Sequence, residues 1–353
     1  MGMLKLGVIG AGLIGQKHVA LVAVHGACEL VALCDANPDM AAIAARYGTH
    51  FYQDYRTLLA EAPLDGVIIA TPTPLHAEVG VACAERGVPM LVEKPLAASL
   101  TEARALVTVA ERQGVPILVG HHRRHNPLVQ EARRIVQRGV LGNLVGVSAL
   151  FTLLKPAEYF RVSWRTQPGG GPILINLIHD IDNLRFICGE VERVFCMTSH
   201  SNRDFAVEDT AGITMRFVNG ALGSLLVSDT TPAPWSYELT SRENAAYPPT
   251  GEDCYHFCGT KGSLTFPSLR MWHYLQEEAA GWYQPLQEQH IAVAPIDPLR
   301  AQLDHFCRVI RGEEIPLVSG REGFKTLAVT QAILESARCQ QPVCPEAFSP
   351  QPN

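Results

Sequence analysis

A glycine-rich turn near the N-terminus constrains the fold of this chain more than any other feature. Residues 4–9 form a short apolar run, a GxGxxG pattern follows at residues 10–15, and an apolar helical stretch comes next. A second apolar run over residues 30–34 ends in Asp35, 20 residues past the last of these glycines. A strand, three glycines, a helix, a second strand and an acid at this distance are typical of a dinucleotide-binding site.

Each residue of the turn has its own physical task at such a site. Gly10 allows a tight turn, Gly12 lets the backbone approach a pyrophosphate, and Gly15 lets the helix pack close to the sheet. The helix that begins at Leu13 and Ile14 offers backbone N–H groups and a partial positive charge to the phosphates. We therefore expect these five residues to bind the dinucleotide.

The acid after the second strand favours NAD over NADP. Asp35 can accept hydrogen bonds from both ribose hydroxyls of an adenosine, and its charge would repel a 2′-phosphate. Ala36 offers no cation that could bind such a phosphate. We therefore expect NAD as the cofactor.

Composition argues against several classes of partner. The net charge of the 353 residues is −6 and no long basic run occurs, so we expect no nucleic-acid partner. No apolar run approaches the roughly 18 residues that cross a bilayer, so we expect a cytoplasmic protein without a membrane partner. The ten cysteines are scattered without a CxxC spacing, which predicts reduced core thiols and no metal site.

The order of helix and strand signals predicts an α/β protein of two domains. Strands and helices alternate up to about residue 121, which predicts a doubly wound parallel sheet. Closely spaced strand signals follow and indicate a C-terminal α+β domain on an open, mostly antiparallel sheet. We expect an NAD-binding Rossmann domain over residues 1–121 and a substrate-binding and oligomerisation domain over residues 122–353.

Several polar residues follow directly after strands of the expected parallel sheet. Ligands of such sheets bind at the carboxyl ends of the strands, so these residues should line one crevice. Thr71 and Pro72 follow one strand, and Glu93 and Lys94 follow another. Lys94 can hold or transfer a proton at a substrate oxygen, whereas a surface salt bridge with Glu93 is the alternative interpretation.

A helix predicted over residues 172–188 carries polar side chains among apolar ones. Asn176 and His179 share one face of it at a spacing of three residues. The pKa of an ordinary histidine lies near 6.5 and suits acid–base catalysis. His179 is therefore a candidate general base and substrate ligand, although a buried histidine can also be purely structural.

Four motifs occur together along the chain. They are GVIGAGLIG at 7–15, TPT-P-LH at 71–76, EKP at 93–95 and GGG…HxxD at 169–182. In combination they resemble the Gfo/Idh/MocA family, which includes glucose–fructose oxidoreductase and inositol dehydrogenase. The resemblance extends to GTKGS at 259–263 and to residues 303–337.

The resemblance implies NAD(P)-dependent oxidation of a hydroxyl on a sugar, cyclitol or related polyol. It matches Lys94 and His179 to the family's catalytic lysine and histidine, and it places His76 in the cofactor region. It also implies a C-terminal sheet through which dimers or tetramers form. We therefore expect a dehydrogenase that transfers hydride from a secondary hydroxyl to NAD, as a homo-oligomer.

One departure from the family pattern leaves alternatives open. Many members have an aspartate four residues before the histidine, and this chain has Ile175 there. Asn176 is polar but cannot act as a general base. Either Lys94 and His179 suffice, or the reaction is a redox-neutral one of a glycosidase or epimerase type. A noncatalytic NAD-binding sensor is a third possibility.

A dense basic cluster lies where the first domain passes into the second. Residues 121–125 contain three histidines and two arginines, and Arg124 matches an arginine that the family has before a proline. We expect His122 and Arg124, with Arg165 from a later loop, to bind substrate. Arginine pairs with carboxylates, so the cluster predicts a sugar acid, with a solvated linker as the alternative.

Overall fold

The computed structural model describes residues 2–276, 278 and 280–349. The chain divides into two compact units. The first contains residues up to 122 together with 298–327 and 347–349, and the second contains 123–297 and 328–346. The single boundary expected near residue 121 therefore does not account for the C-terminal segments that return to the first unit.

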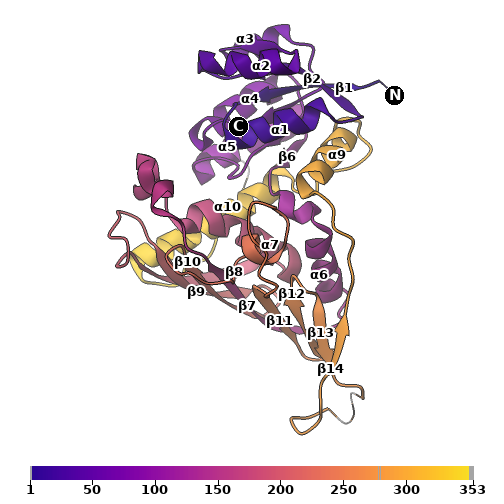
Figure 1. Ribbon diagram of the computed structural model, residues 1–353, viewed down its shortest axis with the longest axis vertical. Coiled ribbons are helices and arrows are strands. Elements are labelled where there is room, and N and C mark those ends of the chain that lie inside the picture. Colours follow the sequence, from indigo (N-terminus) through magenta and orange to yellow (C-terminus); the bar gives the residue numbers. More distant parts are fainter. Residues whose placement is uncertain (1, 277, 279, 350–353) are drawn as a thin grey trace. The chain divides into compact units, whose positions relative to one another are not determined.

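The first unit is built on a parallel sheet with strand order β3-β2-β1-β4-β5-β6 (Figure 1). This order is that of a Rossmann fold, as expected. Its central strands are fully buried because helices cover both faces, which is why they read as unbroken apolar runs. The strands are β1 Leu4–Ile9, β2 Cys28–Cys34, β3 His50–Tyr52, β4 Gly66–Ile69, β5 Met90–Val92 and β6 Ile117–Val119.

The helices of this unit follow the strands in alternation. Ser99 and Glu102 form a capping box at the start of α5. Helix α9 comes from the C-terminal part of the chain and lies against α1. The helices are α1 Leu13–Ala23, α2 Ala41–Tyr47, α3 Tyr55–Glu61, α4 His76–Glu85, α5 Leu100–Gln113 and α9 Pro298–Ile310, with 3₁₀ turns at Pro38–Met40 and Thr73–Leu75.

The second unit is built on a mostly antiparallel sheet with strand order β14-β13-β12-β11-β7-β10-β9-β8. Strands β7 and β10 form its parallel pair. Along β9, buried and exposed residues alternate, so one face of the sheet is covered and the other is open. The strands are β7 Leu144–Thr152, β8 Val191–Ser199, β9 Thr210–Phe217, β10 Leu222–Ser228, β11 Tyr255–Gly259, β12 Gly262–Phe266, β13 Arg270–His273 and β14 Gln287–His290.

Helices α6 and α7 pack side by side in this unit (Figure 1). A π-helical turn, Ile173–Leu177, leads directly into α7. Helix α10 begins in the first unit and ends in the second. The helices are α6 Pro127–Gln137, α7 Ile178–Cys188, α8 Tyr237–Thr240 and α10 Gly320–Cys339, with 3₁₀ turns at His122–His125, Ala157–Arg161 and Ser163–Thr166. Among the described residues, no helix is long and apolar enough to span a membrane.

Candidate functional site

The glycine turn between β1 and α1 is tightly packed on one side and open on the other. Gly10 has a φ of +101°, and a Cβ there would lie 2.4 Å from the Ala70 carbonyl oxygen. A Cβ on Gly15 would lie 2.0 Å from the carbonyl oxygen of Gly10. Gly12, the N-cap of α1, has open space where its Cβ would be. The turn therefore leaves the N-terminus of α1 accessible to an anion.

Asp35 holds the glycine turn in place from the end of β2. Its Oδ2 accepts a hydrogen bond of 2.7 Å from the N–H of Ala11, and its Oδ1 accepts one of 2.9 Å from the N–H of Asn37. The carboxylate is half-buried beside the turn, and Ala36 next to it is exposed. A carboxylate in this position can still accept hydrogen bonds from ribose hydroxyls.

Lys94 follows Glu93, a buried carboxylate in hydrogen-bond contact with His18. The Glu93 carboxylate lies 2.8 Å from Nε2 of His18, and both side chains are buried. Burial acts to raise the pKa of Glu93, but the hydrogen bond to His18 and nearby cationic groups, His122 among them, lower it to about 2. The other Glu93 oxygen accepts the Lys94 N–H at 3.2 Å. The lysine itself is half-buried at the carboxyl end of β5.

His76 connects the loop that contains Lys94 to the loop that follows β4. Its Nδ1 lies 2.8 Å from the carbonyl oxygen of Pro95, and its Nε2 lies 2.9 Å from that of Thr71. The imidazole is buried, and burial lowers its pKa despite the two carbonyl oxygens. Both ring nitrogens thus face the protein backbone, so His76 orders the 71–76 and 93–95 loops. Pro72 is exposed at the start of the first of them.

In the second unit, Asn176 lies in the π turn and His179 lies in the first turn of α7. A π turn precedes the helix, so the α-helical spacing that placed both residues on one face does not hold across the junction. Both side chains are partly exposed. Ile175, which stands where many relatives have aspartate, is also partly exposed in the same turn.

Lys155 is a candidate site residue that the sequence pattern does not single out. Its Nζ donates a hydrogen bond of 2.8 Å to Oδ1 of Asn176 and lies 3.2 Å from Oδ2 of Asp229. Burial lowers the pKa of this ammonium, and the charge of Asp229 opposes that shift. The contact fixes the Asn176 amide with its oxygen toward Lys155. Only the fold brings these residues together, because they come from three separate segments.

The glycines before the π turn make room for another acid. A Cβ on Gly171 would lie 2.2 Å from the carboxylate of Glu208, which accepts the Ile173 N–H at 3.0 Å. Burial raises the pKa of Glu208, with Asp229 acting in the same direction. The glycine run is therefore needed for this close approach at the start of the helix.

The arginines of the basic cluster are neutralised by acids of their own unit. Arg124 donates from Nε and Nη2 to the two oxygens of Asp182, at 2.8 and 2.7 Å, and both residues are buried. Arg123 donates to Glu238 at 2.6 Å and lies 3.7 Å from Asp180. The two arginines therefore do not need an anionic ligand to balance their charge, because their counterions belong to the chain. The buried pair with Asp182 favours a structural role for Arg124.

Arg165 and His122, which were also expected to bind substrate, interact with residues of their own units. Arg165 donates to the carbonyl oxygen of Tyr159 at 2.8 Å, and its guanidinium stacks over the ring of the same residue at 4.0 Å. Both are half-buried in the loop that precedes the glycine run. His122 is half-buried in the first unit and contributes to the charge around Glu93.

Comparison with known proteins assigns this geometry to a family. A protein-family model, described as an oxidoreductase family with an NAD-binding Rossmann fold, matches residues 4–121. The model of the GFO/IDH/MocA C-terminal domain matches residues 129–265. The chain belongs to the GFO/IDH/MocA family. It is thus an NAD-dependent oxidoreductase, in agreement with the resemblance of its motifs.

Individual members of the GFO/IDH/MocA family align over different shares of the chain. The rhizopine catabolism protein MocA of Rhizobium meliloti is 34% identical over 54% of this chain and 59% of that protein. The D-apiose dehydrogenase of Paraburkholderia graminis is 28% identical over 95% of this chain and 88% of its own. The crystal structure of the WlbA dehydrogenase from Bordetella pertussis, in complex with NADH and UDP-GlcNAcA, superimposes with a TM-score of 0.78 at 25% identity. The match covers 97% of this chain and 99% of that one.

The residues of the first unit fit the NAD that this family uses. The open backbone at Gly12 and the N-terminus of α1 suit a pyrophosphate, and the Asp35 carboxylate suits an adenosine ribose. Glycine at positions 10, 12 and 15 leaves the turn without side chains that could obstruct it.

Proposed function

We propose that this oxidoreductase oxidises a secondary hydroxyl of a sugar, cyclitol or sugar acid. The observation that carries the proposal is the placement of Lys94. It follows β5 at the carboxyl end of the Rossmann sheet, where its backbone N–H donates to Glu93 and the carbonyl oxygen of the next residue, Pro95, contacts His76. Such fixed positioning is what a residue needs to act on a substrate oxygen next to a cofactor.

Lys94 and His179 both act on the substrate hydroxyl in this proposal. When bound, NAD supplies the hydride acceptor. One of the two side chains accepts the hydroxyl proton, and the other donates a hydrogen bond to the same oxygen. Asn176 cannot take a proton, but with its oxygen held by Lys155 it presents its NH₂ group as a donor for a substrate oxygen. The absence of a carboxylate at Ile175 makes His179 the candidate base of this helix.

The roles assigned to the other residues follow from their contacts or from their position in the fold. Leu13, Ile14 and Pro72 border the proposed cofactor site, and Thr71, His76 and Glu93 order the loops around it. His122 is proposed as a substrate ligand on its position after β6 alone. Arg165 is proposed to shape the loop through Tyr159 and not to bind substrate directly.

Substitution of the two proposed catalytic residues tests the function. Lys94→Ala and His179→Ala should each lower kcat by about 10² to 10⁴, the range of general acid–base catalysis, and leave NAD affinity nearly unchanged. Lys17→Ala is the matched control, because Lys17 is an exposed lysine on α1. A near-normal kcat in either variant, on the substrate found by screening, would remove that residue from the mechanism.

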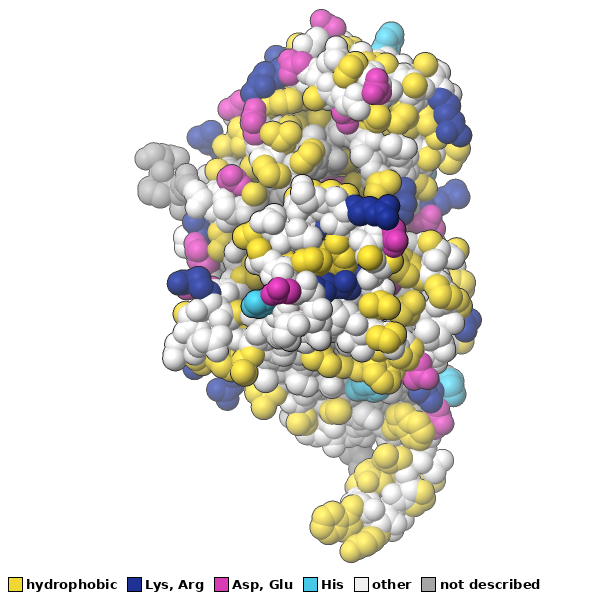
Figure 2. Space-filling view, turned by 60° about the vertical axis from the view of Figure 1, so that its left-hand side comes forward, with side chains coloured by type: hydrophobic (Ala, Val, Ile, Leu, Met, Phe, Trp, Pro, Cys, Tyr) yellow, Lys and Arg dark blue, Asp and Glu magenta, His cyan; other side chains and the backbone are white. Residues whose placement is uncertain are grey.

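We further propose that two copies of the chain associate through the open face of the second sheet. That face carries exposed Leu222, Leu226 and Met197, and Leu222 also lines a hollow with a volume of about 640 Å³. Hydrophobic side chains also gather on the segment between β13 and β14, where Trp282 and Tyr283 are exposed (Figure 2). Leu226→Glu should convert an oligomer to a monomer in light scattering, whereas an unchanged mass would contradict this interface.

The cytoplasm is the compartment that we propose for this protein. All ten of its cysteines are free, and most of them are buried. Free thiols in such number persist in a reducing compartment. Localisation of the tagged chain in fractionated cells would test this assignment, and recovery outside the cytoplasm would contradict it.

A further inference from the structure

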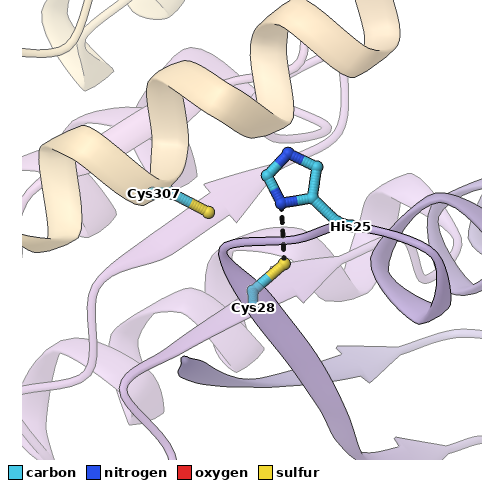
Figure 3. A group of neighbouring side chains, drawn as sticks. All are labelled: His25, Cys28 and Cys307. Carbon is cyan, nitrogen blue, oxygen red and sulfur yellow. Dashed lines mark hydrogen bonds between the residues drawn. The ribbon is translucent and has the colours of Figure 1, made fainter. Parts of the chain in front are cut away.

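Three side chains that commonly bind metal meet on one side of the first unit. His25 follows α1, Cys28 begins β2, and Cys307 lies on α9, near the other end of the sequence. Their ligand atoms all lie within 4.8 Å of one another, and all three residues are buried. Figure 3 shows the side chains converging from these three segments.

The imidazole of His25 is held with one nitrogen available as a ligand. Its Nε2 lies 2.8 Å from Oδ1 of Asp304, and since a carboxylate accepts, Nε2 carries the proton. Its Nδ1 accepts the N–H of Ala27 at 3.2 Å and lies 3.5 Å from Sγ of Cys28. The single lone pair of Nδ1 therefore faces both the Ala27 N–H and the Cys28 thiol. A histidine whose second nitrogen donates to a carboxylate is the usual arrangement around protein-bound zinc.

The spacing of these atoms suits a tetrahedral ion. Zinc bonds of about 2.3 Å to sulfur and about 2.0 Å to nitrogen separate neighbouring ligand atoms by roughly 3.5 to 3.8 Å. The distance of 3.5 Å between Nδ1 of His25 and Sγ of Cys28 already has this value. The limit of 4.8 Å on the remaining pairs leaves side-chain shifts of about 1 Å to complete the site.

We propose that His25, Cys28 and Cys307 form a zinc-binding site, with Asp304 as the partner that orients the histidine. On binding, the two thiols lose their protons to solvent and two thiolates and the imidazole coordinate the ion, whose fourth position is left for water. The Ala27 N–H gives up its contact with Nδ1. Sequence spacing gave no sign of such a site, because Cys307 lies 279 residues after Cys28.

Zinc at this position would connect α9 to the turn between α1 and β2. An ion that binds the folded chain and not the unfolded one stabilises the folded state by the free energy of binding. The site is separate from the glycine turn and from Lys94, so its occupancy should change stability without being required for hydride transfer. The proposal therefore does not depend on the substrate or on the reaction.

A zinc-retention experiment tests the site directly. The parent protein carries Cys258→Ser and Cys344→Ser, which remove the two exposed thiols. It is kept reduced, stripped with a chelator, mixed with one equivalent of Zn²⁺ and desalted, and its zinc content is measured by mass spectrometry. We expect about one ion per chain, a higher Tm with zinc, and thiolate charge-transfer bands when Co²⁺ replaces Zn²⁺.

Variants of this parent separate the site from adventitious binding. Cys28→Ser and Cys307→Ser should each lose the retained zinc and the increase in Tm, whereas Cys188→Ser, a buried thiol elsewhere, should keep both. Asp304→Asn keeps all three ligands and should weaken zinc binding about 10- to 100-fold. Failure of the parent to retain zinc, or equal retention by Cys28→Ser and Cys307→Ser, would overturn the proposal. So would oxidation of the parent to a Cys28–Cys307 disulfide without any zinc affinity in its reduced form.

Discussion

Removal of the Arg124 side chain should destabilise the second unit instead of weakening substrate binding. Arg124 and Asp182 are 2% and 1% exposed, and two hydrogen bonds join them. Arg124→Met keeps much of the aliphatic volume and leaves the Asp182 carboxylate buried without this counterion. Loss of one partner of a buried pair typically costs 3–5 kcal/mol, so we expect a loss of about 4 kcal/mol in unfolding free energy.

A double variant separates the charge from the packing. Arg124→Met with Asp182→Leu removes both charges and should recover most of the loss, since apolar replacements of a buried pair are often neutral. Chemical denaturation monitored in the second unit measures both variants. Two results together would refute this reasoning and restore Arg124 as a substrate ligand. The first is a loss below about 1 kcal/mol in the unfolding free energy of Arg124→Met. The second is a rise in KM, relative to the unmodified protein, that is larger for acidic than for neutral substrates.

Three further predictions concern the first unit. Gly10→Ala should lower both Tm and NAD affinity, because its Cβ would lie 2.4 Å from the Ala70 carbonyl oxygen in a left-handed conformation; thermal melts with and without NAD check this. Asp35→Ala with Ala36→Arg should shift preference toward NADP in binding titrations, and a native protein that binds NADP more tightly would contradict the assignment. Glu93 has a folded pKa of about 2 against an ordinary 4.5, so the unfolded state binds more protons between these values. About 3 kcal/mol of stability should therefore disappear as the pH falls from 4.5 to 2, and Glu93→Gln should flatten that part of the unfolding profile.

Features that depend on local sequence could be predicted before the structure. The glycine turn needs Gly10 and Gly15 for contacts with its immediate neighbours, and the capping box joins Ser99 to Glu102 three residues away. The buried parallel strands are unbroken apolar runs, which is a direct consequence of helices on both faces. Right-handed connections between neighbouring parallel strands are expected on the same grounds.

Features that depend on distant residues could not be predicted in this way. Arg124 meets Asp182 58 residues later, and Arg123 meets Glu238 115 residues later. From sequence alone the cluster is an excess of positive charge, because nothing local shows that the acids fold against it. Strand β14 was also missed, since all four of its residues, Gln287–His290, are exposed and show no apolar alternation.

Lys155 shows the same limit within the candidate site. It is one of several cations in its part of the chain, and only the fold distinguishes it by placing Asn176 and Asp229 around it. The π turn before α7 is similar, because the helix pattern of residues 172–188 carries no signal for a change of hydrogen-bond register. Tertiary packing decides both features.

The ratio of NADH formed to substrate consumed is the most direct test of the proposed dehydrogenase activity. The purified protein would be incubated with NAD and a panel of sugars, cyclitols and sugar acids, and both quantities would be followed in the same sample. We predict one NADH for each molecule of substrate oxidised, and formation slowed by about 10² to 10⁴ with Lys94→Ala. Conversion of a substrate without net NADH would show a redox-neutral reaction, and no conversion across the panel would favour an NAD-binding sensor; either result would contradict the account.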